Sequence, residues 1–502
     1  MNISKTDYIL FRECAKNAWM KIHKPEIFYE AELSEFEKSI IETGNDVELV
    51  ARQLFPGGIL IEGRGEEAQI ITQNELLRKA EILFQPVFIK DGFLAALDIL
   101  QRDAQSGEYT LYEVKATTDV DKKTHYHDLA FQVNLLKRSG ITVKKAHVIH
   151  LNSEYVRQGE INIHQLFVID DVTEEVWQRL PEVEQEMQTA LKYLSEEAEP
   201  SGNCQCVYKG RSNHCATFEY SNPKVPKYGV HDISRIGASK KTLQELIDVG
   251  VFELADVSEE TFKKLTPAQQ NQIVAHVKNA LLIDKYKINE ELGVLQFPLY
   301  FLDYETFPSA IPRFDGFSPY QQIPFQYSLF VLDASDAELR HVEFLHDENT
   351  DPSLGILKSL QENLGTSGSI IVWNKKFECK INEELAVRNS QYKEFVVAAN
   401  ARVYDLMDIF GKQYYVHKDF QGRISIKKVL PVLVPSLSYK TLQIQEGGTA
   451  SQKWNEAVTL STPQEKQKIT TDLKEYCKLD TLAMVKIYEH LITTIDESST
   501  NK

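Results

Sequence analysis

Two groups of acidic residues, one in each half of the chain, are of the type that binds divalent cations. They are Asp98 and Glu113 with Lys115 in the first group, and Asp303 and Glu305 with the distant Tyr476 and Asp480 in the second. Hard divalent cations need oxygen ligands. Such cations activate water and stabilise the charge that builds on phosphorus. The two groups therefore make cleavage of nucleic acid the first hypothesis.

The first group gains weight from the predicted geometry of its strands. Residues 94–98 read as an apolar strand that ends on Asp98, and residues 109–115 as its hairpin partner. Because side chains alternate along a strand, Glu113 and Lys115 share one face. The two carboxylates would hold Mg²⁺ or Mn²⁺, and the lysine would position or polarise the attacking water. The alternative is an exposed hairpin with a surface Glu/Lys pair.

Two further residues favour the metal site over the exposed hairpin. Glu48 lies in a predicted helix over residues 44–51 and is a further candidate metal ligand. Gln132 lies in a later helical stretch, from which it could orient the lysine or a phosphate.

Four cysteines form a second constellation in the N-terminal part. Cys204, Cys206 and Cys215 are spaced C-x-C-x8-C, and Cys14 is the remaining cysteine of this part. Four thiolates can bind an iron–sulfur cluster or zinc, and here they would join the two ends of one domain. The alternative is a set of scattered free thiols, which the close spacing of the last three disfavours.

These motifs resemble the RecB-like branch of the PD-(D/E)XK nucleases, in particular its iron–sulfur, CRISPR-associated exonuclease members. The resemblance covers residues 1 to about 220 and includes the early cysteine, the helix motif, D…ExK, the glutamine motif and the late cysteines. It implies metal ligands at Asp98 and Glu113, a catalytic Lys115, and a 4Fe–4S cluster on the four cysteines. The chain departs from that branch in its late cysteine spacing, which is more often C-x2-C, and in Glu48, where histidine is frequent.

Three motifs in the C-terminal part resemble the DEDD superfamily of RNase H-like 3′→5′ exonucleases. They are FLDYE at residues 301–305, VWNKKFE at 372–378 and YCKLD at 476–480, the last of which marks the tyrosine subclass. The resemblance implies that Asp303, Glu305, Glu378 and Asp480 hold two cations while Tyr476 orients the attacking water. Glu378 departs from the usual aspartate.

Three other residues of this part were interpreted less specifically. Asp405 is either an auxiliary acid or a helix cap. Cys379 and Cys477 adjoin candidate site residues and are interpreted as small buried side chains.

The order of predicted elements indicates an α/β multidomain protein in three parts. Residues 1–225 form a PD-(D/E)XK, restriction-endonuclease-like domain, 226–290 a helical linker, and 291–502 an RNase H-like domain. In the first part, the spacing of apolar residues predicts a helix over residues 173–196. In the linker, residues 233–254 weakly resemble a helix-hairpin-helix, with a plain helical spacer as the alternative.

The whole order resembles a group of bacterial proteins that fuse a RecB-like nuclease domain to an RNase H-like domain. Residues 420–431 look like a signature of that group. In it, Gly422 permits a turn, and Lys427 and Lys428 could contact phosphates. The alternative for this segment is a hairpin with a solvated face.

The charge of the chain limits how it could bind nucleic acid. The formal net charge is −17, whereas phosphate-binding proteins usually carry a basic surface. A binding groove must therefore be a local basic stripe on an acidic body.

No run is long enough to span a bilayer and no signal peptide is recognisable, so we expect a cytoplasmic protein with no membrane partner and with reduced or metal-bound cysteines.

Together these patterns predict a metal-dependent nuclease with two candidate centres that trims or cleaves DNA or RNA. Its expected cofactors are Mg²⁺ or Mn²⁺ and a 4Fe–4S cluster, with zinc as the alternative to the cluster. Single strands or ends are the favoured substrates. The competing hypothesis is a nucleic-acid-binding adaptor in which one or both nuclease folds are inactive.

Overall fold

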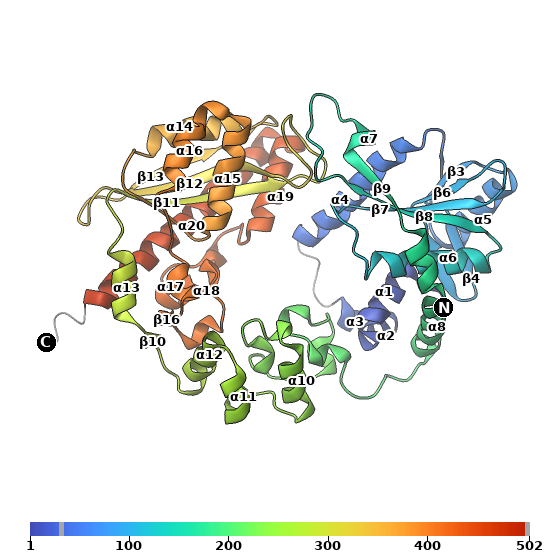
Figure 1. The fold of residues 1–502 in the computed structure, drawn as a ribbon, viewed down its shortest axis with the longest axis horizontal. Helices are drawn as coiled ribbons and strands as arrows, with labels where there is room; N and C mark the ends of the chain where they lie inside the picture. Colours follow the sequence, from blue (N-terminus) through green and yellow to red (C-terminus); the bar gives the residue numbers. More distant parts are fainter. Residues whose placement is uncertain (30–34, 497–502) are drawn as a thin grey trace. The chain divides into compact units, whose positions relative to one another are not determined.

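A computed structural model describes residues 1–29 and 35–496 of the chain. The described residues form a mixed α/β protein with several mixed sheets (Figure 1). They divide into two compact units: unit 1 contains Met1–Val225 and Ala310–Gln321, and unit 2 contains Pro226–Ser309 and Gln322–Lys502.

Unit 1 is built on a six-stranded sheet with the order β2-β3-β6-β7-β8-β9. Its strands are β2 (Ile59–Leu60), β3 (Ile82–Phe84), β6 (Ile99–Arg102), β7 (Tyr109–Lys115), β8 (Val143–Leu151) and β9 (Phe167–Asp171). β7 pairs antiparallel with β6 and parallel with β8. The helices α6 (His125–Arg138) and α8 (Thr173–Ser195) pack on each other and on β8 (Figure 1). The helix expected over residues 173–196 is thereby confirmed.

The strand predicted at residues 94–98 differs from the structure. β5 (Phe93–Ala96) ends before Asp98 and pairs with β1 (Ile3–Ser4) and β4 (Val87–Lys90) in a separate three-stranded sheet. The antiparallel partner of β7 is instead β6. Asp98 thus lies where the chain passes from one sheet to the other. The unbroken apolar run Leu94–Leu97 contains no turn residue that would have revealed this change of sheet.

A short segment that follows the strand β11 (Leu299–Pro308) in sequence belongs to unit 1. Ala310 lies in a hydrophobic cluster with residues of β3 and β8, and Ile311 and Tyr320 pack against the same cluster. The Tyr320 hydroxyl donates a hydrogen bond to the Ala116 carbonyl oxygen, directly after β7. The Arg157 N–H donates to the Phe317 carbonyl oxygen at 3.0 Å. Residues 310–321 therefore help to complete the core of unit 1.

Unit 2 contains a five-stranded sheet with the order β13-β12-β11-β14-β15. Its strands are β11 (Leu299–Pro308), β12 (Gln322–Leu332), β13 (Arg340–Leu345), β14 (Ser369–Val372) and β15 (Val403–Asp405). β12 is antiparallel to β11 and β13, whereas β14 is parallel to β11 and β15. The helix α20 (Pro463–Asp496) packs along β11 and β12 (Figure 1). β11 carries the FLDYE motif at 301–305, and α20 carries the YCKLD motif at 476–480.

The first part of unit 2 is mostly helical, with one addition to the predicted pattern. Its main helices are α10 (Lys240–Asp248), α11 (Glu259–Lys264), α12 (Pro267–Val277) and α13 (Lys285–Leu292). The two-residue strand β10 (Leu282–Ile283) pairs with β16 (Tyr415–Val416), a contact across more than a hundred residues that periodicity in the sequence could not reveal.

The segment 420–431 contains the predicted turn but not the hairpin that was its alternative interpretation. Gly422 has φ +71°, the left-handed region that favours glycine. Beyond it the chain forms the helix α18 (Ile426–Leu433) rather than a second strand. The helix is favoured because Val429, Leu430 and Leu433, at helical spacing, are all buried. Among the described residues, no helix has the length and apolar character needed to cross a bilayer.

Candidate metal centres

The first acidic group assembles at the centre of unit 1. Glu113 on β7 is 1% exposed. Its Oε1 accepts hydrogen bonds from Lys115 Nζ at 2.6 Å and from Lys5 Nζ at 2.8 Å, and its Oε2 accepts one from Gln132 Nε2 at 2.7 Å. Asp98 Oδ2 accepts the Val114 N–H at 2.7 Å. The alternation of β7 therefore places Glu113 and Lys115 on one face, and α6 supplies Gln132 to the carboxylate.

Two members of this group were missed in the sequence. Lys5 begins the helix α1 (Lys5–Glu13), which is fixed at its N-terminus by a capping box between Ser4 and Asp7. Asp128 on α6 accepts hydrogen bonds from Lys115 at 2.7 Å and from Gln132 at 2.9 Å. The four-residue spacing of Asp128 and Gln132 could have revealed Asp128, because such residues share a helix face. No comparable signal identifies Lys5.

The two carboxyl groups of this centre have opposite pKa shifts. Burial and the neighbouring charge of Glu113 raise the pKa of Asp98 to about 8. Burial would also raise the pKa of Glu113, but the ammonium groups of Lys115 and Lys5 outweigh it and lower that pKa. The centre therefore holds one readily ionised carboxylate and one that resists ionisation until a cation is supplied.

Glu48 has a different environment from the one predicted. It lies on α4 (Glu35–Ala51), and its Oε1 accepts hydrogen bonds from Arg52 Nη2 at 2.7 Å and Gln85 Nε2 at 2.6 Å. Its charge acts on Asp98 and raises the pKa of that residue further. Glu48, Asp98 and Glu113 do not form a group of ligand atoms within 4.8 Å of one another, in contrast to the two groups described next.

The four cysteines of unit 1 converge as predicted. The sulfur atoms of Cys14, Cys204, Cys206 and Cys215 all lie within 4.8 Å of one another, and none is in a disulfide. Cys14 separates α1 from α2 (Ala15–His23), and the other three lie in the loop after α8. Four clustered, mostly buried sulfurs are a donor set suited to a metal ion or an iron–sulfur cluster.

Hydrogen bonds around the cysteines hold the two chain segments together independently of any metal. Trp19 Nε1 donates to the Glu196 carbonyl oxygen at 2.7 Å, and Lys16 Nζ donates to the Gly202 carbonyl oxygen at 2.8 Å. The Thr217 hydroxyl donates to Asn17 Oδ1 at 2.9 Å. The Cys204 sulfur accepts a hydrogen bond from Asn222 Nδ2 at 3.1 Å, which favours its thiolate form.

The second acidic group lies on the central strand of the unit 2 sheet. Ligand atoms of Asp303, Glu305 and Cys477 lie within 4.8 Å of one another. Asp303 and Glu305 are two residues apart on β11 and face the same side of the sheet. α20 brings Tyr476 and Asp480 to that side from one helix face.

Glu378, the residue that departs from the usual motif, is buried and lies within electrostatic reach of Asp303 and Glu305, although it is not among the ligand atoms that lie within 4.8 Å of one another. It lies in the first turn of α15 (Lys375–Arg388), where Asn374 is the N-cap, and it is 3% exposed. Burial raises its pKa, and so do the charges of Asp303 and Glu305. Its Oε2 is buried with no hydrogen-bond partner. A buried carboxylate oxygen without a donor, beside two further acids, fits a position that a divalent cation would occupy.

Two residues of the second group were not recognised as part of it. The Tyr439 hydroxyl donates to Asp480 Oδ1 at 2.6 Å. Lys427 Nζ donates to the Tyr476 hydroxyl at 2.9 Å. Burial raises the pKa of Asp303 and Glu305, and raises that of Asp480 to about 6, while the charge of Lys427 opposes these increases. Lys427 was noted in the sequence as a phosphate contact, but its link to Tyr476, which is 49 residues away, had no sequence signal.

Three residues beside the second acidic group remain: Asp405, Cys379 and Cys477. Asp405 accepts the backbone N–H groups of Lys375 at 2.8 Å and Met407 at 3.1 Å. It thereby caps the first turn of α15, which favours the cap interpretation over that of an auxiliary acid. Cys477 is fully buried and Cys379 is partly exposed.

Comparison with known proteins identifies a family model over residues of unit 2 together with the 310–321 segment of unit 1. Residues 300–425 match the model of a domain of unknown function, DUF2779. This range begins in β11 and includes Asp303, Glu305 and Glu378, but it ends before α18 and α20.

Two curated proteins are similar to longer stretches of the chain. An uncharacterized Mycoplasma pneumoniae protein, described as a homolog of MG366, is 31% identical over 206 residues, which is 37% of this chain and 31% of that protein. The uncharacterized protein UU173 of Ureaplasma parvum serovar 3 is 27% identical over 306 residues, 56% of this chain and 42% of that protein. The matched stretch thus covers less than half of the length of each relative.

Proposed function

We propose that the chain is a metal-dependent nuclease whose principal centre is formed by Asp303, Glu305, Glu378 and Asp480. The observation that carries the proposal is the unpartnered, buried Glu378 Oε2 beside two other carboxylates. Uncompensated buried acids are costly to a fold unless a cation binds them. Divalent cations bound there would activate water and stabilise the charge on a phosphodiester under attack.

The residues of the chain have distinct tasks in this proposal. Tyr476 would orient the attacking water, and Lys427 holds its hydroxyl in place at 2.9 Å. Tyr439 fixes the Asp480 carboxylate by donating to its Oδ1, and Tyr476 is a further hydrogen-bond partner of the same carboxylate. The β11-centred mixed sheet with α20 across it is consistent with an RNase H-like 3′→5′ exonuclease of the tyrosine subclass.

The first centre is proposed as a second nuclease site, of the RecB-like PD-(D/E)XK type. Asp98 and Glu113 would bind Mg²⁺ or Mn²⁺, and Lys115 would act on the attacking water. The four cysteines would carry a 4Fe–4S cluster, with zinc as the alternative, because their sulfurs meet within one metal-site diameter. In the structure the Lys5 and Lys115 ammonium groups both bind Glu113. A metal ion must therefore displace these ammonium groups or share the Glu113 carboxylate with them.

This arrangement of Lys5 and Lys115 also favours a second candidate function. If Lys5 permanently neutralises Glu113, unit 1 would not cut, and it would serve as a nucleic-acid-binding adaptor for the centre in unit 2. The two functions differ in what the loss of each centre does to cleavage.

The test is cleavage of end-labelled single-stranded DNA and RNA with Mn²⁺ by the full chain. Asp303→Ala should abolish stepwise trimming from the 3′ end, whereas Lys115→Ala should spare it. Asp336→Asn, an exposed acid in unit 2, is the matched control and should trim like the parent. Trimming that survives Asp303→Ala would refute the assignment of the principal centre. If Asp303→Ala keeps a residual cleavage that disappears when Lys115→Ala is added, a second active centre is supported. If Asp303→Ala shows no residual cleavage, the adaptor function is supported.

A further inference from the structure

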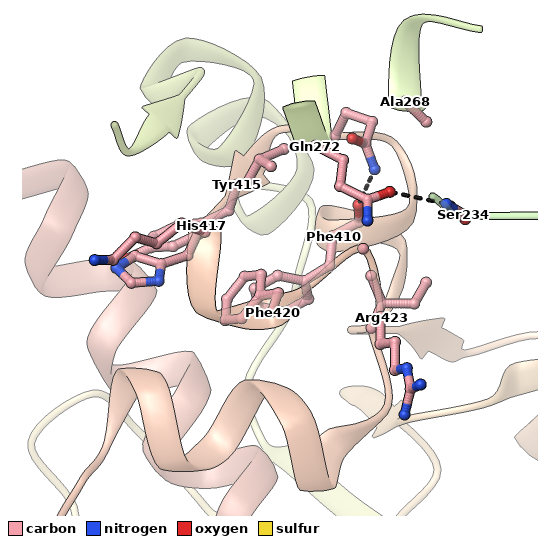
Figure 2. Close-up of a pocket in the computed structure, with 13 residues that line it drawn as sticks. Ser234, Ala268, Gln272, Phe410, Tyr415, His417, Phe420 and Arg423 are labelled. Atoms are coloured by element: carbon pink, nitrogen blue, oxygen red, sulfur yellow. Dashed lines mark hydrogen bonds between the residues drawn. The ribbon is translucent and has the colours of Figure 1, made fainter. Parts of the chain in front are cut away.

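A groove of about 840 Å³ lies in unit 2, on the side of Gly422 and Arg423. Its charged lining residues are Arg235, Lys264 and Arg423, and the hydroxyl-bearing residues Ser239, Thr242 and Thr266 also line it. Figure 2 shows the adjoining pocket, which shares Ser234, Ala268 and Arg423 with this groove.

The groove is basic on a chain that is strongly acidic. No aspartate or glutamate is among its lining residues, although the net charge of the chain is −17. Arg235 and Arg423 are both exposed, and neither has an ion pair within residues 1–29 and 35–496. Lys264 contributes less, because it pairs with Glu260 at 2.8 Å. Two unpaired guanidinium groups in one concave surface are available to an anion from outside.

One buried side chain, that of Gln272, fixes the backbone beside both arginines. Gln272 Oε1 accepts the Ser234 N–H at 2.8 Å (Figure 2). Its Nε2 donates to the Asp232 carbonyl oxygen at 2.8 Å. A Cβ atom on Gly422 would lie 2.4 Å from Gln272 Oε1. The turn at Gly422, which precedes Arg423, therefore packs directly on the side-chain amide of Gln272. The backbone beside both arginines is therefore fixed by buried contacts. Arg235 itself has φ +56°, in the left-handed region.

Two stretches of chain connect residues of the groove with residues of the acidic centre of unit 2. The carbonyl oxygen of Ile424, a residue of the groove lining, accepts a hydrogen bond from Trp373 Nε1 at 3.1 Å. Trp373 immediately precedes Asn374, the N-cap of the helix that carries Glu378. In the other direction, α18 continues from this loop to Lys427, which binds the Tyr476 hydroxyl.

We propose that this groove binds the phosphodiester backbone of a single-stranded nucleic acid and leads its 3′ end to the second centre. Arginine and hydroxyl groups are typical donors to phosphate oxygens. A single strand is favoured because Glu305, Glu378 and Asp480 are buried, so that an unpaired end can reach them and a duplex cannot. The inference rests on the proposed nuclease function and names the substrate-binding surface that it uses.

The test is binding of a labelled oligonucleotide by the full chain in EDTA, measured by fluorescence anisotropy as a function of salt. The variant is Arg235→Ala/Arg423→Ala. The control is Arg340→Ala/Lys393→Ala, which removes the same two charges from exposed positions of unit 2 outside the groove. Single-stranded DNA and RNA are measured in parallel, with the corresponding duplex as a third arm.

Each phosphate contact contributes about 0.7 to the slope of log K against log salt for a single strand. Loss of two contacts should therefore lower that slope by about 1.4 and weaken binding on the order of tenfold at about 0.15 M salt. The control variant should change neither. Equal slopes for the two variants, or a duplex bound as tightly as the single strand, would overturn the proposal.

Cleavage assays separate this inference from the proposed function. If the parent binds through the groove but never cuts with Mn²⁺, the groove stands and the nuclease function fails. If the parent trims single strands and the groove variant binds and trims like the control, the function stands and the groove is refuted.

Discussion

Replacing Asp98 by asparagine should stabilise the protein at alkaline pH when no divalent cation is present. The folded pKa of Asp98 is raised from 3.8 to about 8 by burial and by Glu113. Between these two values the folded state binds a proton that the unfolded state has lost, so stability falls as the pH rises through this window. Asparagine carries no charge, and its side-chain oxygen can still accept the Val114 N–H.

The size of the effect follows from the shift. About four pKa units at about 1.4 kcal/mol each give an upper limit of about 6 kcal/mol above pH 8. Asp98 keeps partial contact with solvent, which lowers this limit. We therefore expect a gain of at least about 1.4 kcal/mol, or one pKa unit, at about pH 9, and no gain near pH 4.

The assay is urea unfolding at several pH values. Unfolding is monitored by hydrogen exchange in the peptide that contains β7, so that unit 1 is measured by itself. Asp46→Asn, an exposed acid on α4, is the matched control. Added Mn²⁺ should stabilise the parent but not Asp98→Asn, because only the parent keeps the ligand. A stability difference between parent and variant that is the same at pH 5 and pH 9 would refute the electrostatic reasoning.

Three further changes have defined outcomes. Glu113→Gln should destabilise unit 1 at neutral pH, because Lys115 and Lys5 lower the pKa of Glu113 against the effect of burial. In urea unfolding, this loss of stability should vanish as the pH falls below the usual range of glutamate. Cys206→Ser should reduce the bound metal or iron measured by elemental analysis and lower the melting temperature of unit 1, since metal binding is coupled to folding, while trimming by the Asp303 centre persists. Gly422→Ala should cost about 1–3 kcal/mol in urea unfolding, because φ +71° and the contact with Gln272 both disfavour a Cβ atom; a variant as stable as the parent would contradict that account.

The elements with a strong local pattern could be predicted from the sequence, and those set by distant pairing could not. The helix at Thr173–Ser195 has an apolar stripe of helical period, and the strand Leu299–Pro308 has a long apolar run. The change of sheet between β5 and β6, in contrast, depends on which strands they meet. The helix after Gly422 was not predicted, and a hairpin was one of two interpretations, because its few residues also suit a short strand.

The candidate sites show the same division. The convergence of Cys14 with three cysteines some 190 residues later could be predicted, because thiols are rare and their chemistry restricts their use. The approach of Lys5 to Glu113 could not, because lysines are common and a pairing across 108 residues leaves no local trace. Tyr439 and Lys427 were likewise missed as partners, since each is defined only by the acid or hydroxyl that it contacts.

The passage of the chain between the two units has a consequence for synthesis and inheritance. Residues 310–321 complete the core of unit 1, yet they are translated after Pro226–Ser309 of unit 2. A nascent chain therefore cannot finish its N-terminal unit until part of the C-terminal unit has left the ribosome. A gene fragment that stops after residue 225 would encode a unit without the Tyr320 contact to Ala116. Recombination could thus not exchange the two units as separate cassettes without exposing apolar surface around Ala310.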